Sequence, residues 1–272
     1  MSFSSPLLKD ISADNDSPSS GLGIGTTPSA LVKHGISTTV VEIDPIVHEF
    51  AVKHFDLQEN NPPVLTDAVK YTADLVKEGS HSFDYIVHDV FTGGADPVDL
   101  FTLEFLQGLS DLLKPNGVAA IVRFYPPSKM TRAALLTNIL FQNYAGDFAL
   151  PTPRLIVRTI LEVFPTCRFF RESPPNADSE GDFTNMVFFC RKSKDPITFR
   201  TPIWEDYLNS RARQVFLEPK HEVQLADLLG EESSVLLRQN NTGMVEEWQM
   251  ISAAGHWAVM RTVLPAQVWN WW

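Results

Sequence analysis

The chain has 272 residues, of which 44% are hydrophobic and 20% charged, and its formal net charge is −11 at pH 7. This length and composition predict a globular protein with one substantial core and exclude a largely disordered chain. The acidic balance argues against a general nucleic-acid binder. Because no apolar run reaches the ~18 residues that a membrane helix needs, we also expect no membrane segment in this chain.

The first 20 residues are expected to be disordered. Residues 10–20 are polar and rich in turn-forming types, and the first 20 residues as a whole lack the basic start and apolar core of a signal peptide. A glycine-rich turn normally follows an apolar strand at the centre of a sheet, but residues 14–20 hold no such run. The sequence therefore predicts that the first strand of the fold is missing.

A glycine-rich turn follows at Gly21, Gly23 and Gly25, and it leads into a helix over residues 28–34 and a β-branched strand over residues 38–43. Glycines in such a turn let the backbone approach a nucleoside closely. A helix and a strand of the expected kind follow this turn, so it is stronger evidence for a nucleoside site than an isolated glycine pattern. We expect a nucleoside site at the end of this first unit.

Acidic residues close the strand after the turn. Glu42 and Asp44 follow the first glycine by about 20 residues, which is the spacing of an acid that accepts hydrogen bonds from ribose hydroxyls. Asp44 precedes Pro45, and this pair is typical of a helix N-cap followed by a first-turn proline. We therefore assign ribose binding to Glu42 and a capping role to Asp44.

Helices and strands alternate through the rest of the first 190 residues. The patterns predict helices over residues 45–55, 68–77, 100–113 and 154–164, and strands over residues 64–66, 83–90, 117–122, 168–171 and 185–190. Strands separated by helices of this length indicate an α/β fold with a Rossmann-like, doubly wound, mostly parallel sheet. Residues 191–272 are richer in polar residues and tryptophan, and we expect them to form a C-terminal appendage of mixed or helical structure.

Five motifs in chain order resemble those of the spermidine/spermine synthase family, which has the class I S-adenosylmethionine-dependent methyltransferase fold. They are Gly-Leu-Gly-Ile-Gly-Thr at 21–26, Val-Val-Glu-Ile-Asp at 40–44, Thr-Asp-Ala at 66–68, Phe-Asp-Tyr-Ile-Val-His-Asp-Val-Phe-Thr-Gly-Gly at 83–94 and Leu-Leu-Lys-Pro-Asn-Gly at 112–117. The resemblance covers roughly residues 21–190. The His-Asp-Val-Phe-Thr-Gly-Gly form is similar to a synthase-like branch, some of whose members carry membrane segments before this domain.

The resemblance implies a role for each candidate site residue. The three glycines would border the sulfonium end of the nucleoside, and Glu42 would hold the ribose. Asp67 and the backbone of Ala68 would bind the adenine edge, although Asp67 also suits a helix cap. Asp89 matches the acid that helps to deprotonate the attacking amine. The implied activity is aminopropyl transfer from decarboxylated S-adenosylmethionine to a polyamine or another amine in polyamine metabolism.

Two alternatives remain open at this point. The same nucleoside site would serve a methyltransferase that uses intact S-adenosylmethionine, and a chain without its first strand could be a catalytically inactive binding protein. The family has a second acid three residues after the first, where this chain has Thr92; residues 96–99 could supply negative charge instead. Members of this family commonly form dimers, so a homodimer is one expectation.

Residues 122–142 interrupt the region after the fifth expected strand. Joining Ile121 directly to Asn143 restores a strand and turn of the family type. The stretch begins Val-Arg, ends Phe-Gln and carries Thr-Asn shortly before its end, so an intron donor, a branch-like sequence and an acceptor could encode it. We hypothesise an in-frame intron that has been translated; the alternative is a genuine lid over the pocket.

The remaining chemistry-bearing residues suggest no further site. Cys167 and Cys190 lie in apolar, strand-like runs, and we expect buried free thiols in a reducing compartment, which favours a cytoplasmic location. His88 lies inside an apolar strand and is expected to be a core histidine. The histidines and acids show no spacing typical of a metal site.

Overall fold

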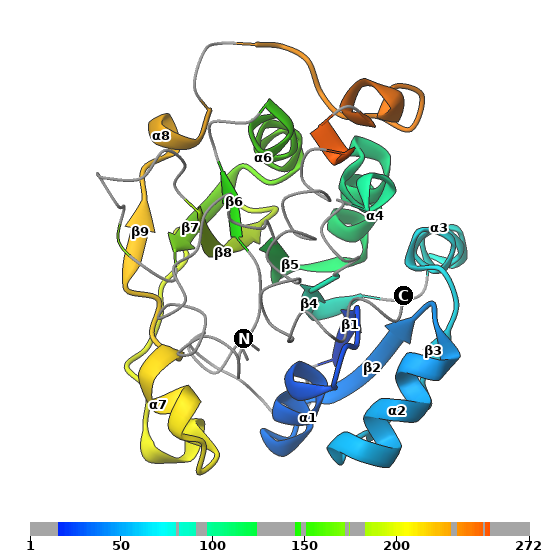
Figure 1. The fold of residues 1–272 in the computed structure, drawn as a ribbon, viewed down its shortest axis with the longest axis vertical. Helices are drawn as coiled ribbons and strands as arrows, with labels where there is room; N and C mark the ends of the chain where they lie inside the picture. Colours follow the sequence, from blue (N-terminus) through cyan, green and yellow to red (C-terminus); the bar gives the residue numbers. More distant parts are fainter. Residues whose placement is uncertain are drawn as a thin grey trace, which may run out of the picture.

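The computed structural model describes residues 16–79, 82–90, 97–123, 145–147, 151–171, 174, 183–229, 233–246 and 248–250. These residues build a nine-stranded sheet with helices on both faces (Figure 1). The strands are β1 Asp16–Ser20, β2 Ser37–Glu42, β3 Val64–Leu65, β4 Phe83–His88, β5 Leu113–Arg123, β6 Ala145–Asp147, β7 Thr166–Arg171, β8 Phe183–Arg191 and β9 His221–Val223. The α-helices are α1 Thr26–Lys33, α2 Pro45–Phe55, α3 Ala68–Glu78, α4 Leu103–Leu112, α6 Pro151–Val163, α7 Arg211–Phe216 and α8 Leu225–Leu229, and the 3₁₀ turns are η1 Val98–Phe101, η2 Trp204–Tyr207 and η3 Thr242–Val245.

The sheet has the order β3-β2-β1-β4-β5-β8-β7-β9, and β6 also pairs with β8. The five strands from β3 to β5 run parallel, whereas β8 is antiparallel to both β5 and β7. The chain order reverses between β1 and β4, so that α1 and α2 cover one face and α3, α4 and α6 cover the other (Figure 1). The expected Rossmann-like, mostly parallel α/β fold is confirmed, and its switch point lies where ligands bind in such sheets.

The expectation that the first strand is missing is wrong. Residues Asp16–Ser20 form β1 at the centre of the sheet, pairing with β2 from Asp16 to Ser20 and with β4 at Ser19 and Ser20. Consequently these five residues are not part of a disordered start, and residues 1–15 lie outside the described part of the chain. The strand forms without apolar residues because strands on both sides pair with its backbone and its serine side chains are small enough for a buried position.

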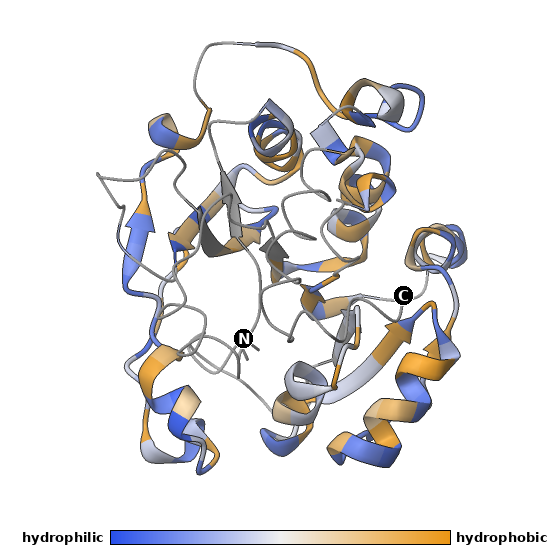
Figure 2. Cartoon of the chain, in the orientation of Figure 1, coloured by the Kyte–Doolittle hydropathy of each residue, from blue (hydrophilic) through white to orange (hydrophobic). Residues whose placement is uncertain are grey.

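The main hydrophobic core lies between the sheet and the helices α4 and α6. It includes Leu106, Ile121, Ile156 and Phe188, each fully buried. Figure 2 shows that α6 turns apolar residues toward the sheet and polar residues outward. A smaller cluster around Phe189 packs on the opposite face. The alternation of side chains along β5 and β8 supplies both clusters, because successive residues of a strand point to opposite faces.

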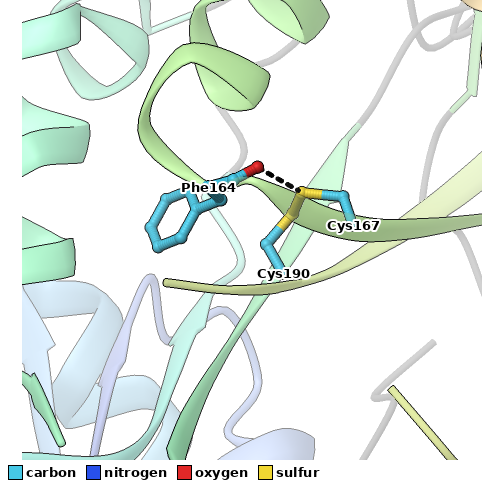
Figure 3. The surroundings of a disulfide bond; sticks show 3 residues. All are labelled: Phe164, Cys167 and Cys190. Carbon is cyan, nitrogen blue, oxygen red and sulfur yellow. Dashed lines mark hydrogen bonds between the residues drawn. A yellow bond between two sulfur atoms is a disulfide. The ribbon is translucent and has the colours of Figure 1, made fainter. Parts of the chain in front are cut away.

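The two cysteines are joined in a disulfide between β7 and β8, so the expectation of free thiols is wrong (Figure 3). Cys167 and Cys190 are direct partners in the antiparallel register, with their Cα atoms 4.2 Å apart. The sulfur of Cys167 lies 3.7 Å from the carbonyl oxygen of Phe164 (Figure 3). Sequence spacing did not reveal this pairing because the register between strands brings the two residues together. The disulfide also removes the argument for a reducing compartment, which rested on free thiols.

The segment after β8 is attached to the sheet rather than separate from it. Its strand β9 pairs with β7, and Arg168 of β7 binds Glu222 of β9 with a distance of 2.7 Å between Nε and Oε1. Farther along, the buried Asp206 accepts hydrogen bonds from Arg200 and from the backbone of Ile203. Within the described ranges, no helix is long and apolar enough to cross a membrane.

Candidate functional site

The glycine turn packs tightly against the end of β4. Gly21 has a φ of +83°, and a Cβ at this position would lie 2.0 Å from the carbonyl oxygen of Asp89. Gly25 has a φ of +79°, and its Cβ would lie 2.5 Å from the side chain of Leu57. Only glycine satisfies both the positive φ and the close approach. Gly23 would meet no atom within 4 Å, so the middle of the turn is open to a ligand.

Glu42 ends β2 beside this turn and is buried, with 9% of its surface exposed. Its Oε2 accepts a hydrogen bond of 2.9 Å from the backbone N–H of Leu22, and its Oε1 accepts one of 3.0 Å from the N–H of Asp44. These two bonds fix the carboxylate at the turn. A carboxylate offers about four lone-pair sites, so two remain for donors such as ribose hydroxyls.

Asp44 and Asp67 both cap helices. Asp44 accepts the N–H of Ile46 at 2.8 Å at the start of α2, as the proline pattern predicted. Asp67 accepts the N–H of Val69 at 2.8 Å at the start of α3. Glu42 is level with Leu65 at the end of β3, so the exposed Asp67 and Ala68, which follow β3 closely, lie at the same end of the sheet as Glu42. Adenine contact by Asp67 and Ala68 remains a prediction.

Asp89 follows β4 directly and is partly buried. Its backbone N–H donates to the carbonyl oxygen of Ser20 at 2.9 Å, which holds it against β1. Burial raises the pKa of the Asp89 carboxyl to about 6, and a hydrogen bond from the Thr27 side chain partly opposes this rise. A carboxyl with this pKa can exchange a proton near neutral pH. No sequence pattern indicated Thr27, because this residue becomes a neighbour of Asp89 only when α1 packs beside the end of β4.

His88 is fully buried one residue before Asp89, as expected of a core histidine. Its Nδ1 lies 3.0 Å from the hydroxyl oxygen of Ser20, and its ring packs against those of Phe101 and Phe105. Burial lowers the pKa of His88 to about 4, so its ring is neutral at physiological pH. Ser20 therefore contacts His88 through its side chain and Asp89 through its carbonyl oxygen.

The fold brings the glycine turn, Glu42 and Asp89 together at one edge of the sheet. The strand register explains this, because Ser20 is level with Val41 on one side and with His88 on the other. Thr92 and Asp96 lie outside the described residues.

A cavity of about 290 Å³ lies between α1 and α7, lined in part by Ile24, Gly25 and Thr26 of the glycine turn but by none of the candidate carboxylates. Among the residues that the structure describes, no group of three or more histidine, cysteine or acidic side chains could hold a metal ion. The candidate site therefore lies at the carboxyl ends of β1, β2 and β4, in the middle of the sheet.

Comparisons with known proteins show which proteins this chain resembles. Residues 21–140 match the spermine/spermidine synthase domain, and the match begins at the glycine turn. A probable spermidine synthase from Corynebacterium glutamicum has a similar structure, with a TM-score of 0.55 and 16% identity over 84% of this chain and 76% of that one. The chain therefore has the Rossmann-like fold that S-adenosylmethionine-dependent methyltransferases and spermidine synthases share.

Two curated relatives differ in the activity that their names state. The chain is 48% identical over 262 residues to an N-terminal histidine N-methyltransferase from Emericella nidulans, a match that covers 93% of this chain and 43% of that protein. It is 38% identical over 102 residues to a polyamine aminopropyltransferase from Vibrio vulnificus, covering 36% of this chain and 34% of that protein. The aligned parts thus span less than half the length of both relatives.

The expectation of aminopropyl transfer is overturned by the first of these relatives. Its similarity is higher in identity and extends over most of the chain, whereas the aminopropyltransferase matches about a third. The comparison supports the methyltransferase alternative, and with it intact rather than decarboxylated S-adenosylmethionine. A role in polyamine biosynthesis is not supported over methylation. The glycine turn and the acid at the end of β2 did not distinguish these reactions, because both reactions use an adenosyl sulfonium compound.

Proposed function

We propose that this chain is an S-adenosylmethionine-dependent N-methyltransferase whose acceptor is a polypeptide that begins with histidine. One observation carries the proposal: the 48% identity to the N-terminal histidine N-methyltransferase, which extends over 93% of the chain. Thr92 supports it as well, because the second acid expected at this position in a polyamine-binding enzyme is absent. A neutral acceptor nitrogen needs fewer carboxylates than a polyamine with several charges.

Glu42 and the glycine turn would hold the nucleoside part of S-adenosylmethionine. The two backbone hydrogen bonds to Glu42 keep its carboxylate in place before a ligand arrives, which reduces the cost of ordering it on binding. Asp67 and Ala68 would border the adenine. When bound, S-adenosylmethionine supplies a methyl group on a positively charged sulfur, which is a good leaving group.

Asp89 would act on the acceptor nitrogen. A histidine side chain has an ordinary pKa near 6.5, so most of it is neutral and nucleophilic at pH 7. The ring nitrogen without a proton would attack the methyl carbon as the bond from this carbon to sulfur breaks, and the other ring nitrogen must then lose its N–H proton. The Asp89 carboxylate can orient the acceptor by accepting its N–H and can then take that proton. Because this role requires the ionised form, we expect kcat/KM to fall as the pH drops below about 6.

The experiment uses the purified chain, S-adenosylmethionine and synthetic peptides that begin with histidine, with an acetylated histidine, or with alanine. We expect mass spectrometry to show one added methyl group on the first peptide only, and fragmentation to identify the methylated nitrogen. Asp89→Asn should lower kcat/KM by about 10²-fold or more. Asp74→Asn, which changes an exposed carboxylate of α3, is the matched control.

Other outcomes would contradict the proposal. Transfer of an aminopropyl group from decarboxylated S-adenosylmethionine to putrescine would restore the reaction rejected above. Tight calorimetric binding of S-adenosylmethionine without methylation of any peptide would exclude histidine-initiated polypeptides as acceptors. Full turnover by Asp89→Asn would remove the role of that carboxylate and leave the nucleoside site intact.

A further inference from the structure

Two strands of the sheet pair with β8 as if they were one. β5 follows β8 from Ala119 opposite Cys190 to Arg123 opposite Met186. β6 continues on the very next residue of β8, with Ala145 opposite Asn185, and ends with Asp147 opposite Phe183. Arg123 and Ala145 therefore occupy consecutive positions along β8, although 21 residues, 124–144, separate them in the sequence.

The side-chain alternation of β5 and β8 makes this register meaningful. Ala119 and Ile121 of β5 face the core beneath α4 and α6 together with Phe188 of β8, whereas Ala120 and Phe189 face the opposite cluster. A strand keeps this alternation only if its residue count is preserved, because a shift by one residue exchanges the two faces. A removal of 21 residues places Ala145 at the position after Arg123 and preserves the alternation.

We propose that β5 and β6 are two parts of a single strand and that residues 122–142 are an insertion which the fold does not need. The sequence supports the same length independently, since joining Ile121 to Asn143 removes 21 residues and restores a strand and turn of the family type. Removal of residues 122–142 and removal of residues 124–144 both leave Ala145 opposite Asn185. The interruption is an in-frame segment consistent with a translated intron.

The place of the interruption connects it with the candidate site. β5 is parallel to β4, so its end at Arg123 lies at the same sheet edge as Asp89. An unbroken strand would continue past this edge along β8. The shorter chain keeps the pairing of β4 with β5 up to Ile121, so we expect it to bind S-adenosylmethionine at least as tightly as the full chain.

Two deletions that differ by one residue test the proposal without relying on enzyme activity. Removal of residues 122–142 preserves the register on β8, whereas removal of residues 122–141 shifts it by one residue. We expect the first variant to unfold at a Tm equal to or above that of the full chain. The second should unfold at least about 5 °C lower, because the residues that continue the strand after the junction would turn to the opposite face of the sheet.

A Tm for the 21-residue deletion below that of the full chain, or equal values for the two deletions, would overturn the proposal. Calorimetry with S-adenosylmethionine gives a second measurement on the same three proteins. Sequencing of the transcript tests the origin of the segment. A message that lacks codons 122–142 supports splicing, and uniform retention of these codons in abundant message contradicts it.

Discussion

Two inner strands of the same sheet, β1 and β8, differ in almost every property that predicts a strand. β8 carries Met186 through Cys190, all of them buried and apolar, and it is joined to β7 by a disulfide. β1 is built from Asp16–Ser20, and it buries Ser17 and Ser19, whose hydroxyl groups have no hydrogen-bond partner among the residues that the structure describes. β8 forms because its side chains favour burial, whereas β1 forms because β2 and β4 pair with its backbone.

The difference shows that position in a sheet can replace hydrophobicity in a strand. Parallel strands on both sides supply the backbone hydrogen bonds that β1 needs, whatever its side chains are. The cost falls on the hydroxyl groups of Ser17 and Ser19, which lose contact with water and gain no hydrogen-bond partner in the described part of the chain. We therefore expect substitutions in β8 to destabilise the protein strongly and substitutions at Ser17 and Ser19 of β1 to have small or favourable effects.

The largest expected effect is in β8. Phe188 is fully buried and stacks edge-on against Phe169 with ring centroids 4.8 Å apart. Phe188→Ala should lower the free energy of unfolding by about 3–5 kcal/mol, since it removes buried apolar surface and leaves a cavity. Urea denaturation measures this change. Phe50→Ala in α2, where the side chain is 53% exposed, is the control and should change stability by less than about 0.5 kcal/mol.

The disulfide should contribute somewhat less than Phe188 to the free energy of unfolding. It closes a loop between residues 23 apart in sequence, and replacement of both Cys167 and Cys190 by alanine should cost about 3 kcal/mol through the larger freedom of the unfolded chain. Treatment of the unchanged protein with a reductant should produce a similar loss in urea denaturation. Identical stability of the oxidised and reduced proteins would show that the cross-link between β7 and β8 does not stabilise the fold.

A comparable loss of stability should arise at low pH from His88, whose side chain connects β4 with β1 through Ser20. The pKa of His88 is lowered to about 4 in the folded protein, against an ordinary value of 6.5. Its contribution is complete above pH 6.5 and is lost as the pH falls toward 4, because only the unfolded chain takes up the proton. The loss should reach roughly 3 kcal/mol at pH 4.

Stability measured by urea denaturation from pH 7 to pH 4 tests this prediction. His88→Asn, which cannot titrate in this range, should show a shallower decline than the unchanged protein. Parallel curves for the two proteins would mean that another group causes the acid sensitivity.

The smallest effect is expected in β1 and has the opposite sign. Ser19→Ala removes a buried hydroxyl without a partner and should raise the free energy of unfolding by about 1 kcal/mol. Ser20→Ala is the matched control, because its hydroxyl contacts His88 and its loss should cost about 1–3 kcal/mol. If both substitutions destabilise equally, the hydroxyl of Ser19 has a role that its surroundings do not reveal.

The sequence by itself determined the local features of this protein. The alternation of helices and strands predicted the α/β fold, and Asp44 before Pro45 predicted the cap of α2 that the structure confirms. The glycines and Glu42 marked the sheet edge because these residue types have chemical and conformational requirements that depend on few neighbours.

Tertiary structure alone decided the features that depend on partners distant in sequence. Asp16–Ser20 became a strand only between β2 and β4, and Cys167 met Cys190 only through the register of β7 on β8. Likewise, the pairing of β6 as a continuation of β5 is visible only along β8. Local propensity cannot predict such features, because their free energy comes from hydrogen bonds and contacts between segments that the folded chain brings together.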